Sequence, residues 1–204
     1  SARGPLGPVG SVAIVLVPVL IIFIGWLSWD KNVDYAVAAV VAARGQEKFL
    51  ERDVTKSENL MKRATEMAPD VPIYYHNLAG IYVAYQNAYD EAVANNPGAE
   101  VQTCEQAFGL DASSSGRPDK RCAEESYFTN LEGFRKNKTS PQAKLVLANS
   151  TLLLAQLGYE GKDEEALQYY TELIQMIPAS WPLHNALGGA YLNLGRPAES
   201  VPVL

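Results

Sequence analysis

The stretch at residues 181–200, WPLHNALGGAYLNLGRPAES, decides the fold. Its apolar residues recur at spacings of three or four, the period of one helix face. The pattern predicts a first helix that runs to Leu194, a turn at Gly195 and Arg196, and a second helix that starts near Pro197. The chain stops at Leu204, inside that second helix. We therefore expect the last unit to be incomplete and the working protein to be longer.

An earlier copy of this pattern lies upstream. The stretch that starts at Met67, MAPDVPIYYHNLAGIYVAY, aligns without a gap with the stretch that starts at Met176, MIPASWPLHNALGGAYLNL. The matching pairs are Met67 and Met176, Pro69 and Pro178, Leu78 and Leu187, Gly80 and Gly189, and Tyr82 and Tyr191. Such repetition predicts a chain of stacked copies of one unit, each of which buries its apolar face against the next.

The unit resembles the tetratricopeptide repeat (TPR), a pair of helices of about 34 residues. Leu187, Gly188 and Tyr191 fall on that family's first-helix positions, and Gly195 falls in its turn. The preceding copy matches the turn glycine, the small and aromatic residues of the second helix and the closing proline at Gly161, Ala166, Tyr170 and Pro178. The small residues Gly188 and Ala166 let paired helices approach closely, and a proline ends the second helix. The resemblance implies an all-α solenoid.

This register divides residues 30–204 into about 3.5 helix pairs. Repeat one is expected at 33–68, where Ser57 caps the second helix. Repeat two starts at Val71, carries an insertion at 95–122 and has its second helix at 124–137. Repeat three is expected at 140–179, and the incomplete repeat four starts at Trp181.

Residues 9–29 differ from the rest, because they carry no charge over a length that crosses a bilayer. Trp26 and Trp29 lie at one end of this run, before Asp30 and Lys31, as is typical of a membrane interface. We predict a transmembrane helix at 9–29 after a short segment at 1–8; a cleaved signal peptide is the alternative. The charges weakly favour a cytoplasmic N-terminus, hence a single-pass protein of the inner membrane whose C-terminal domain is extracytoplasmic.

Two cysteines, Cys104 and Cys122, flank a turn-rich part of the insertion, and a disulfide between them would close it. Two free thiols in a cytoplasmic loop are the alternative. The triplets NKT at Asn137 and NST at Asn149 match the N-glycosylation pattern, which counts only in an exported protein of a glycosylating organism.

The sequence offers no pattern for catalysis, for a cofactor or for a metal. His76 and His184 have no partner residues of an active site nearby, and two isolated cysteines are too few for a zinc site. The net charge of −6, without a cluster of Lys and Arg, also argues against nucleic-acid binding. We therefore expect a binding protein.

The resemblance implies that the concave face, formed by the first helices, binds protein segments. The candidates on that face are Tyr75, Asn77, Tyr82, Asn149, Asn185 and Asn193, aromatic and amide groups suited to an extended peptide or a carbohydrate; contacts between helices are the alternative for each. We expect a membrane-anchored scaffold that holds partner proteins, among them other membrane subunits, at the extracytoplasmic surface, with the bilayer contacting residues 9–29.

A second reading depends on residues 142–197, which resemble the C-terminal TPR tail of bacterial O-antigen ligase or polymerase-like membrane proteins. Such proteins transfer lipid-linked glycans, with catalysis in loops between membrane spans. None of those loops is present in this sequence. In this reading the chain is a non-catalytic fragment of a larger enzyme.

Overall fold

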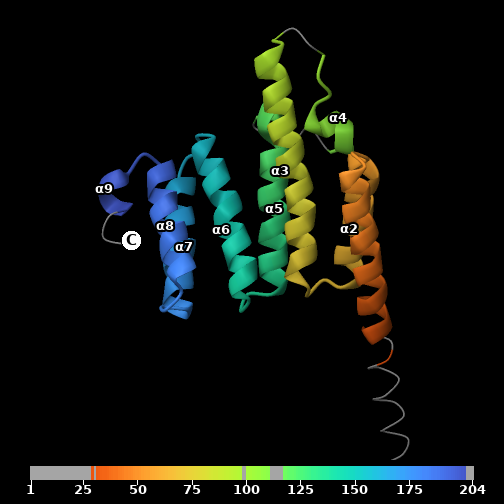
Figure 1. The fold of residues 1–204 in the computed structure, drawn as a ribbon, viewed down its shortest axis with the longest axis horizontal. Helices are drawn as coiled ribbons and strands as arrows, with labels where there is room; N and C mark the ends of the chain where they lie inside the picture. Colours follow the sequence, from red (N-terminus) through yellow and green to blue (C-terminus); the bar gives the residue numbers. More distant parts are fainter. Residues whose placement is uncertain (1–28, 30, 98–99, 111–116, 201–204) are drawn as a thin grey trace, which may run out of the picture.

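The computed structural model describes residues 29, 31–97, 100–110 and 117–200, and within these ranges it contains helices and no strand. A helix at residues 31–50 comes first. The elements that follow are α2 (Val54–Met67), α3 (Pro72–Asn95), α4 (Cys104–Phe108), the 3₁₀ turn η2 (Pro118–Lys120), α5 (Arg121–Lys136), α6 (Pro141–Gln156), α7 (Lys162–Met176), α8 (Trp181–Asn193) and α9 (Pro197–Ser200). The main helices stand side by side in a row that follows the chain from the helix at 31–50 to α9 (Figure 1).

The row is a series of helix pairs in which each pair contacts the next. Helix α3 pairs with α5 and α6 pairs with α7, while α5 packs on α6 and α7 packs on α8. Prolines stand in the first turn of α3, α6 and α8, where a missing N–H costs nothing because no carbonyl precedes it in the helix. The predicted all-α, solenoid-like arrangement of helix pairs is thus confirmed.

Small buried residues set the distance between paired helices. Gly45, Ala79, Ala148 and Gly188, one in each of the four first helices, are all buried. At Gly45 an added Cβ would lie 3.1 Å from the Met61 side chain of α2, so nothing larger than glycine fits without a shift. Ala166 of α7 is fully buried as well. Close helix contact therefore depends on small side chains, as the sequence predicts.

Two glycines form the turn between α6 and α7. Gly158 and Gly161 have φ values of 80° and 73°, in the left-handed region that favours glycine. Gly195, between α8 and α9, has the same conformation at 72°, and α9 begins at Pro197. The turns at Gly161 and Gly195 were both predicted.

The start of α2 differs from the prediction. Asp53, not Ser57, is the N-cap, and its carboxylate accepts a hydrogen bond from the Lys56 backbone N–H at 3.2 Å. Ser57 is fully buried in the first turn, where its hydroxyl donates to the Gly45 carbonyl at 2.8 Å. The assignment of Ser57 as a cap was wrong, because its hydroxyl joins α2 to the neighbouring helix.

The second helix of repeat two begins earlier than predicted. Helix α5 starts at Arg121 and ends at Lys136, so Cys122 belongs to its first turn and not to the insertion. Asn95, at the other predicted limit, is the last residue of α3. The connection between α3 and α5 is therefore residues 96–120, which we call the insertion, and its helix α4 lies above α2 beside α3 (Figure 1).

The predicted membrane helix at 9–29 and the segment at 1–8 lie outside the described residues, apart from Trp29. In the part of the chain that the structure describes, no helix combines the length and the apolarity that a membrane crossing needs. The membrane span stays a prediction from the sequence.

Candidate ligand-binding face

In the helix at 31–50, in α3 and in α6, the residue after the buried small residue is exposed. These residues are Gln46, Gly80 and Asn149. Gln46 and Gly80 line one hollow, and Gly80 and Asn149 line another. We call the side that carries them the first-helix face.

The larger hollow has a volume of about 400 Å³ and lies between α3 and α6, over α5. We call it the α3–α6 hollow. Its size falls in the range typical of ligand sites, about 300–1,000 Å³. The lining residues are His76, Ala79, Gly80, Val83, Ala84 and Asn87 of α3, Ser126 and Asn130 of α5, and Val146, Asn149, Ser150 and Leu153 of α6.

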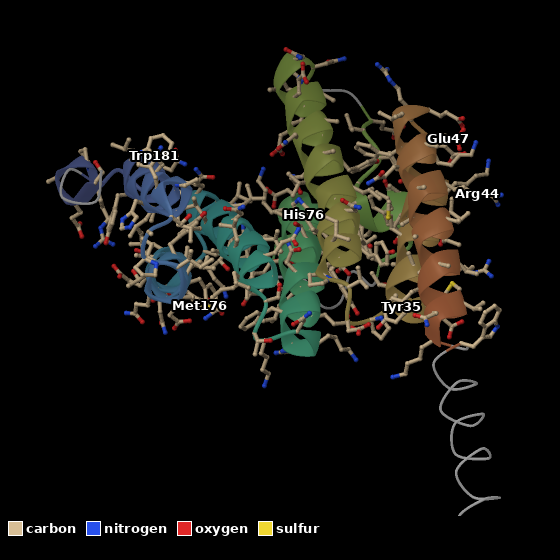
Figure 2. All side chains as sticks on the ribbon, turned by 60° about the horizontal axis from the view of Figure 1, so that its bottom comes forward. Tyr35, Arg44, Glu47, His76, Met176 and Trp181 are labelled. Atoms are coloured by element: carbon tan, nitrogen blue, oxygen red, sulfur yellow. A yellow bond between two sulfur atoms is a disulfide. The ribbon has the colours of Figure 1, made fainter. Side chains whose placement is uncertain are left out.

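A second hollow, of about 290 Å³, lies on the other side of α3, against α2 and the helix at 31–50. Three residues of α3 line both hollows: His76, Gly80 and Ala84. They are spaced by four and so form one ridge along the helix. His76 lies near the middle of the array (Figure 2). Gly80 has no side chain, so the ridge is low at this point. An added Cβ there would meet nothing within 4 Å.

The α3–α6 hollow is electrically neutral and mostly apolar. None of the described residues that line it is an acid, a lysine or an arginine. Partial desolvation lowers the pKa of the His76 imidazole from its ordinary value of 6.5, although the residue is exposed at the surface. A ligand group in the hollow therefore meets no acid, lysine or arginine among the lining residues.

Three side-chain atoms of α5 are buried without a hydrogen-bond partner among the described residues, and one of them, Arg121 Nε, lies away from this hollow. The other two, Ser126 Oγ and Asn130 Oδ1, belong to residues that line the hollow and have side chains that are 1% and 4% exposed. The amide nitrogen of Asn130 does have a partner, because Nδ2 donates a hydrogen bond to the Val146 carbonyl at 3.4 Å. An unsatisfied buried polar group typically costs about 1–3 kcal/mol.

The structure places the two predicted tyrosines of the binding face in the core, and we correct both assignments. Tyr82 is fully buried, and its hydroxyl donates to Glu58 Oε1 at 2.9 Å; burial and that carboxylate raise its pKa. Tyr75 is 4% exposed, and an added Cβ at Gly133 of α5 would lie 2.8 Å from it. Burial raises the pKa of Tyr75 to about 12. Both tyrosines hold helices together.

The predicted asparagines lie nearer the surface. Asn77 lines the hollow against α2, and Asn149 is exposed at the rim of the α3–α6 hollow, where its Oδ1 accepts a hydrogen bond from Tyr170 at 2.6 Å. Asn185 is half-buried and Asn193 is exposed, both on α8, and neither lines one of these two hollows. The structure thus brings Asn149 together with Ser126, Asn130 and His76.

Sequence reasoning missed Gly80, Ser126 and Asn130 as site residues. Gly80 carried a signal, because it pairs with Gly189 in the aligned stretches of the sequence. Ser126 and Asn130 are four residues apart on one helix, but only their neighbours in space show that both are buried.

The two glycosylation candidates have hydrogen-bonded amides. Asn137 is the C-cap residue of α5, and its Nδ2 donates to the Asp70 carbonyl at 3.1 Å. Asn149 accepts the bond from Tyr170. Their modification stays a prediction.

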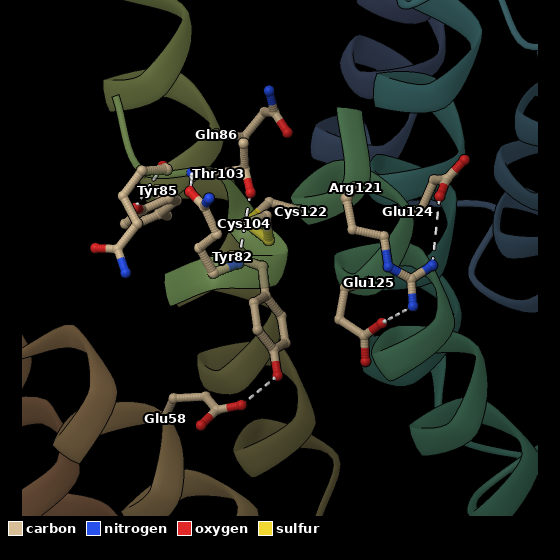
Figure 3. The surroundings of a disulfide bond; sticks show 12 residues. Glu58, Tyr82, Tyr85, Gln86, Thr103, Cys104, Arg121, Cys122, Glu124 and Glu125 are labelled. Carbon is tan, nitrogen blue, oxygen red and sulfur yellow. Dashed lines mark hydrogen bonds and ion pairs between the residues drawn. A yellow bond between two sulfur atoms is a disulfide. The ribbon is translucent and has the colours of Figure 1, made fainter. Parts of the chain in front are cut away.

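Cys104 and Cys122 form a disulfide, with their Cα atoms 5.5 Å apart, beside Glu58, Tyr82 and Arg121 (Figure 3). The bond is buried and ties α4 to the first turn of α5. Phe108 of α4 packs edge-on against the ring of Tyr82, with centroids 5.2 Å apart. Gln86 of α3 adds a link, because its Nε2 donates to the Asp119 carbonyl at 2.8 Å.

Buried charges surround this disulfide. The Arg121 guanidinium lies between two carboxylates, 3.4 Å from Glu124 and 3.3 Å from Glu125 (Figure 3). Glu124 also accepts a hydrogen bond from the Tyr159 hydroxyl at 2.7 Å, which links repeat two to the turn of repeat three. Burial raises the pKa of Glu125. Over the described ranges, no group of three or more His, Cys, Asp or Glu is arranged to hold a metal ion.

Comparison with known proteins shows distant likeness in structure. No protein-family model matches the chain, and no curated protein matches it. MamA (MSR-1) is 17% identical, with a TM-score of 0.45 over 81% of this chain and 72% of that chain. TTC0263, a thermophilic TPR protein in Thermus thermophilus, is 16% identical, with a TM-score of 0.36 over 81% and 87%. Both TM-scores lie below 0.5, so the TPR-like description depends on this chain's own helix pairs and residue pattern.

Proposed function

We propose that the chain is a membrane-anchored scaffold that holds segments of partner proteins on its first-helix face, at the extracytoplasmic membrane surface. The observation that carries this proposal is the pair of hollows on either side of α3, which share His76, Gly80 and Ala84. Together they form an uneven surface over three successive first helices. An extended segment of a partner is the ligand that suits such a surface.

Two features of the sequence and structure support the location. The uncharged run at 9–29 has the length of a membrane span. The disulfide between Cys104 and Cys122 is typical of proteins outside the cytoplasm, where thiols are oxidised. The role as the tail of a glycan-transferring enzyme has no comparable support from the described residues.

The binding role is tested by filling the shared ridge. Gly80→Leu places a side chain in open space beside both hollows and removes a helix glycine, so the protein stays folded. The matched control is Glu66→Leu, at an exposed position of α2 away from both hollows. The tagged full chain is purified in mild detergent, and bound proteins are quantified by mass spectrometry. We expect Gly80→Leu to reduce partner recovery at least tenfold and Glu66→Leu to leave it unchanged; equal recovery from both variants contradicts the proposal.

The location is tested with a single exposed cysteine. Lys138→Cys lies in the exposed turn between α5 and α6. A membrane-impermeant maleimide applied to intact cells should label this variant, and the native disulfide pair should stay unlabelled. Labelling that requires permeabilised cells contradicts an extracytoplasmic domain.

A further inference from the structure

The unpartnered atoms beneath the α3–α6 hollow have complementary hydrogen-bonding roles. Asn130 Oδ1 is an acceptor, and Ser126 Oγ carries a hydroxyl that can donate. The two residues are four positions apart on α5, so their side chains lie next to each other on one face of that helix. A ligand that satisfies both atoms must offer a donor and an acceptor side by side.

A primary carboxamide has this pattern. Its NH₂ group and its carbonyl oxygen lie on one edge of a planar group, so the NH₂ can donate to Asn130 Oδ1 while the oxygen accepts from the Ser126 hydroxyl. In a trans backbone peptide the N–H and C=O point in opposite directions, so one backbone amide cannot reach both atoms from one edge. A carboxylate has no donor for Asn130 Oδ1.

The surroundings fit the same group. The walls of the hollow supply apolar side chains for the methylene groups of a ligand, among them Val83, Val146 and Leu153. No acid, lysine or arginine among the lining residues would favour an ion. A buried pair of hydrogen bonds also discriminates strongly against a ligand that lacks the partner groups, because both protein atoms would stay unsatisfied.

We infer that the α3–α6 hollow is a specificity pocket for the side-chain carboxamide of a glutamine or asparagine in the bound partner segment, read by Ser126 and Asn130. This inference rests on the proposed function, because it names the side chain that the first-helix face selects. Asn149 and His76, at the same hollow, lie beside the entering chain.

The experiment measures binding of short peptides to the full chain. The probe is acetyl-Ala-Ala-Gln-Ala-Ala with a C-terminal N-methylamide, so that its glutamine carries the sole primary carboxamide. Matched peptides replace the glutamine by asparagine, methionine, glutamate or alanine. Dissociation constants come from chemical-shift titration of the ¹⁵N-labelled protein. We expect the glutamine or the asparagine peptide to bind at least tenfold more tightly than the methionine, glutamate and alanine peptides.

Three variants test the residues. Ser126→Ala should abolish the preference for glutamine over methionine and should not lower the melting temperature, because the hydroxyl has no partner among the described residues. Gly80→Leu should weaken binding of every peptide at least tenfold, whereas Glu66→Leu, at an exposed position of α2 away from both hollows, should change nothing. A fall in melting temperature for Ser126→Ala would show that the hydroxyl is structural, and it would overturn the inference.

Equal affinities for the glutamine, methionine and alanine peptides would also overturn it, and would point to contacts with the peptide backbone alone. That outcome leaves the proposed function intact if Gly80→Leu still releases the partner proteins. If the carboxamide preference holds while partner recovery is insensitive to Gly80→Leu, the pocket exists and the scaffold role fails.

Discussion

The helix pairs of repeats two and three have the same antiparallel arrangement but are connected in different ways. Helices α6 and α7 are joined by five residues, 157–161, with Gly158 and Gly161 in the left-handed conformation. Helices α3 and α5 are joined by the insertion, which carries α4 and is tied to α5 by the disulfide. One pairing is thus set by local backbone geometry and the other by a covalent bond and long-range contacts.

The interiors of the two repeats differ as well. In repeat three the buried residues are apolar side chains such as Leu152, Leu167 and Leu173, with the uncharged Ser150 and Thr151. Repeat two buries Arg121 and Glu124 within its second helix and packs against the buried Glu58 of α2. Buried charged side chains thus lie near the disulfide in repeat two, and none is found in repeat three.

The largest expected effect is the loss of the central buried cation. In Arg121→Met, the carboxylates of Glu124 and Glu125 lose the guanidinium that lies between them at a site where the arginine side chain is 7% exposed. Removal of one partner from a buried ion pair typically costs about 3–5 kcal/mol. Urea denaturation followed by circular dichroism should show this fall in the free energy of unfolding.

The control is Arg196→Met, which removes an arginine that bonds Glu199 and Glu164 at the exposed end of the array. Exposed ion pairs contribute little, so the urea midpoint should stay nearly constant. Equal losses of unfolding free energy in both variants would show that the buried ion pairs of repeat two contribute no more to stability than the exposed pairs of Arg196.

Removal of the disulfide should have the next largest effect. The double variant Cys104→Ala, Cys122→Ala releases a link across a sequence separation of 18 residues. A loop of that size is worth about 3 kcal/mol in the chain-entropy model. Hydrogen exchange should rise in α4 and at the start of α5, while α7 keeps the protection of the wild-type protein. Faster exchange throughout α7 would show that repeat three also depends on the disulfide.

A smaller effect is expected at the turn of repeat three. Gly161→Ala places a side chain at a φ of 73°, and the left-handed conformation costs about 1–2 kcal/mol for a residue with a Cβ. Gly161→Asn is the matched control, because asparagine adopts this conformation more readily. Thermal denaturation should rank the proteins as wild type, then Asn, then Ala. An alanine variant as stable as wild type would mean that the local turn does not set this pairing.

The smallest expected effect is the pH dependence that His76 adds to repeat two. Repeat three, at residues 140–179, contains no histidine. Because burial lowers the pKa of folded His76, the unfolded chain binds its proton more readily. The stability contributed by the neutral imidazole is complete above pH 6.5, the ordinary pKa of histidine, and is lost as the pH falls through the lower pKa of the folded protein.

The wild-type melting temperature should therefore drop slightly more than that of His76→Gln between about pH 7.5 and pH 5. An NMR titration of the His76 ring protons should give a pKa below the ordinary 6.5. A higher value would indicate an acidic neighbour and a charged hollow at neutral pH.

Sequence patterns predicted the parts of the fold that local chemistry determines. Apolar spacing and the turn residues located α7, α8 and the start of α9, since Gly161, Gly195 and Pro197 act on the backbone at their own positions. The start of α5 was three residues out, because Arg121 and Cys122 are helical in the setting of the disulfide and the ion pairs.

The candidate site was less predictable, because helical period alone does not say which face meets solvent. Tyr82 has the spacing of a face residue, yet its ring is buried and its hydroxyl bonds Glu58 of another repeat. Asn149 was found because it lies on the exposed side of α6. Ser126 and Asn130 became candidates only when the packing of α3, α5 and α6 was known.

The disulfide also changes how this chain would carry mechanical load. When tension is applied along the polypeptide, it passes from Cys104 to Cys122 through the sulfur atoms and bypasses the backbone between them. At roughly 3.5 Å for each extended residue, a bypass of this separation withholds about 60 Å of contour length. Under tension, an unfolded repeat three would therefore extend to the full contour length of its residues. An unfolded repeat two would extend less, and the withheld length would become available only after the disulfide is reduced.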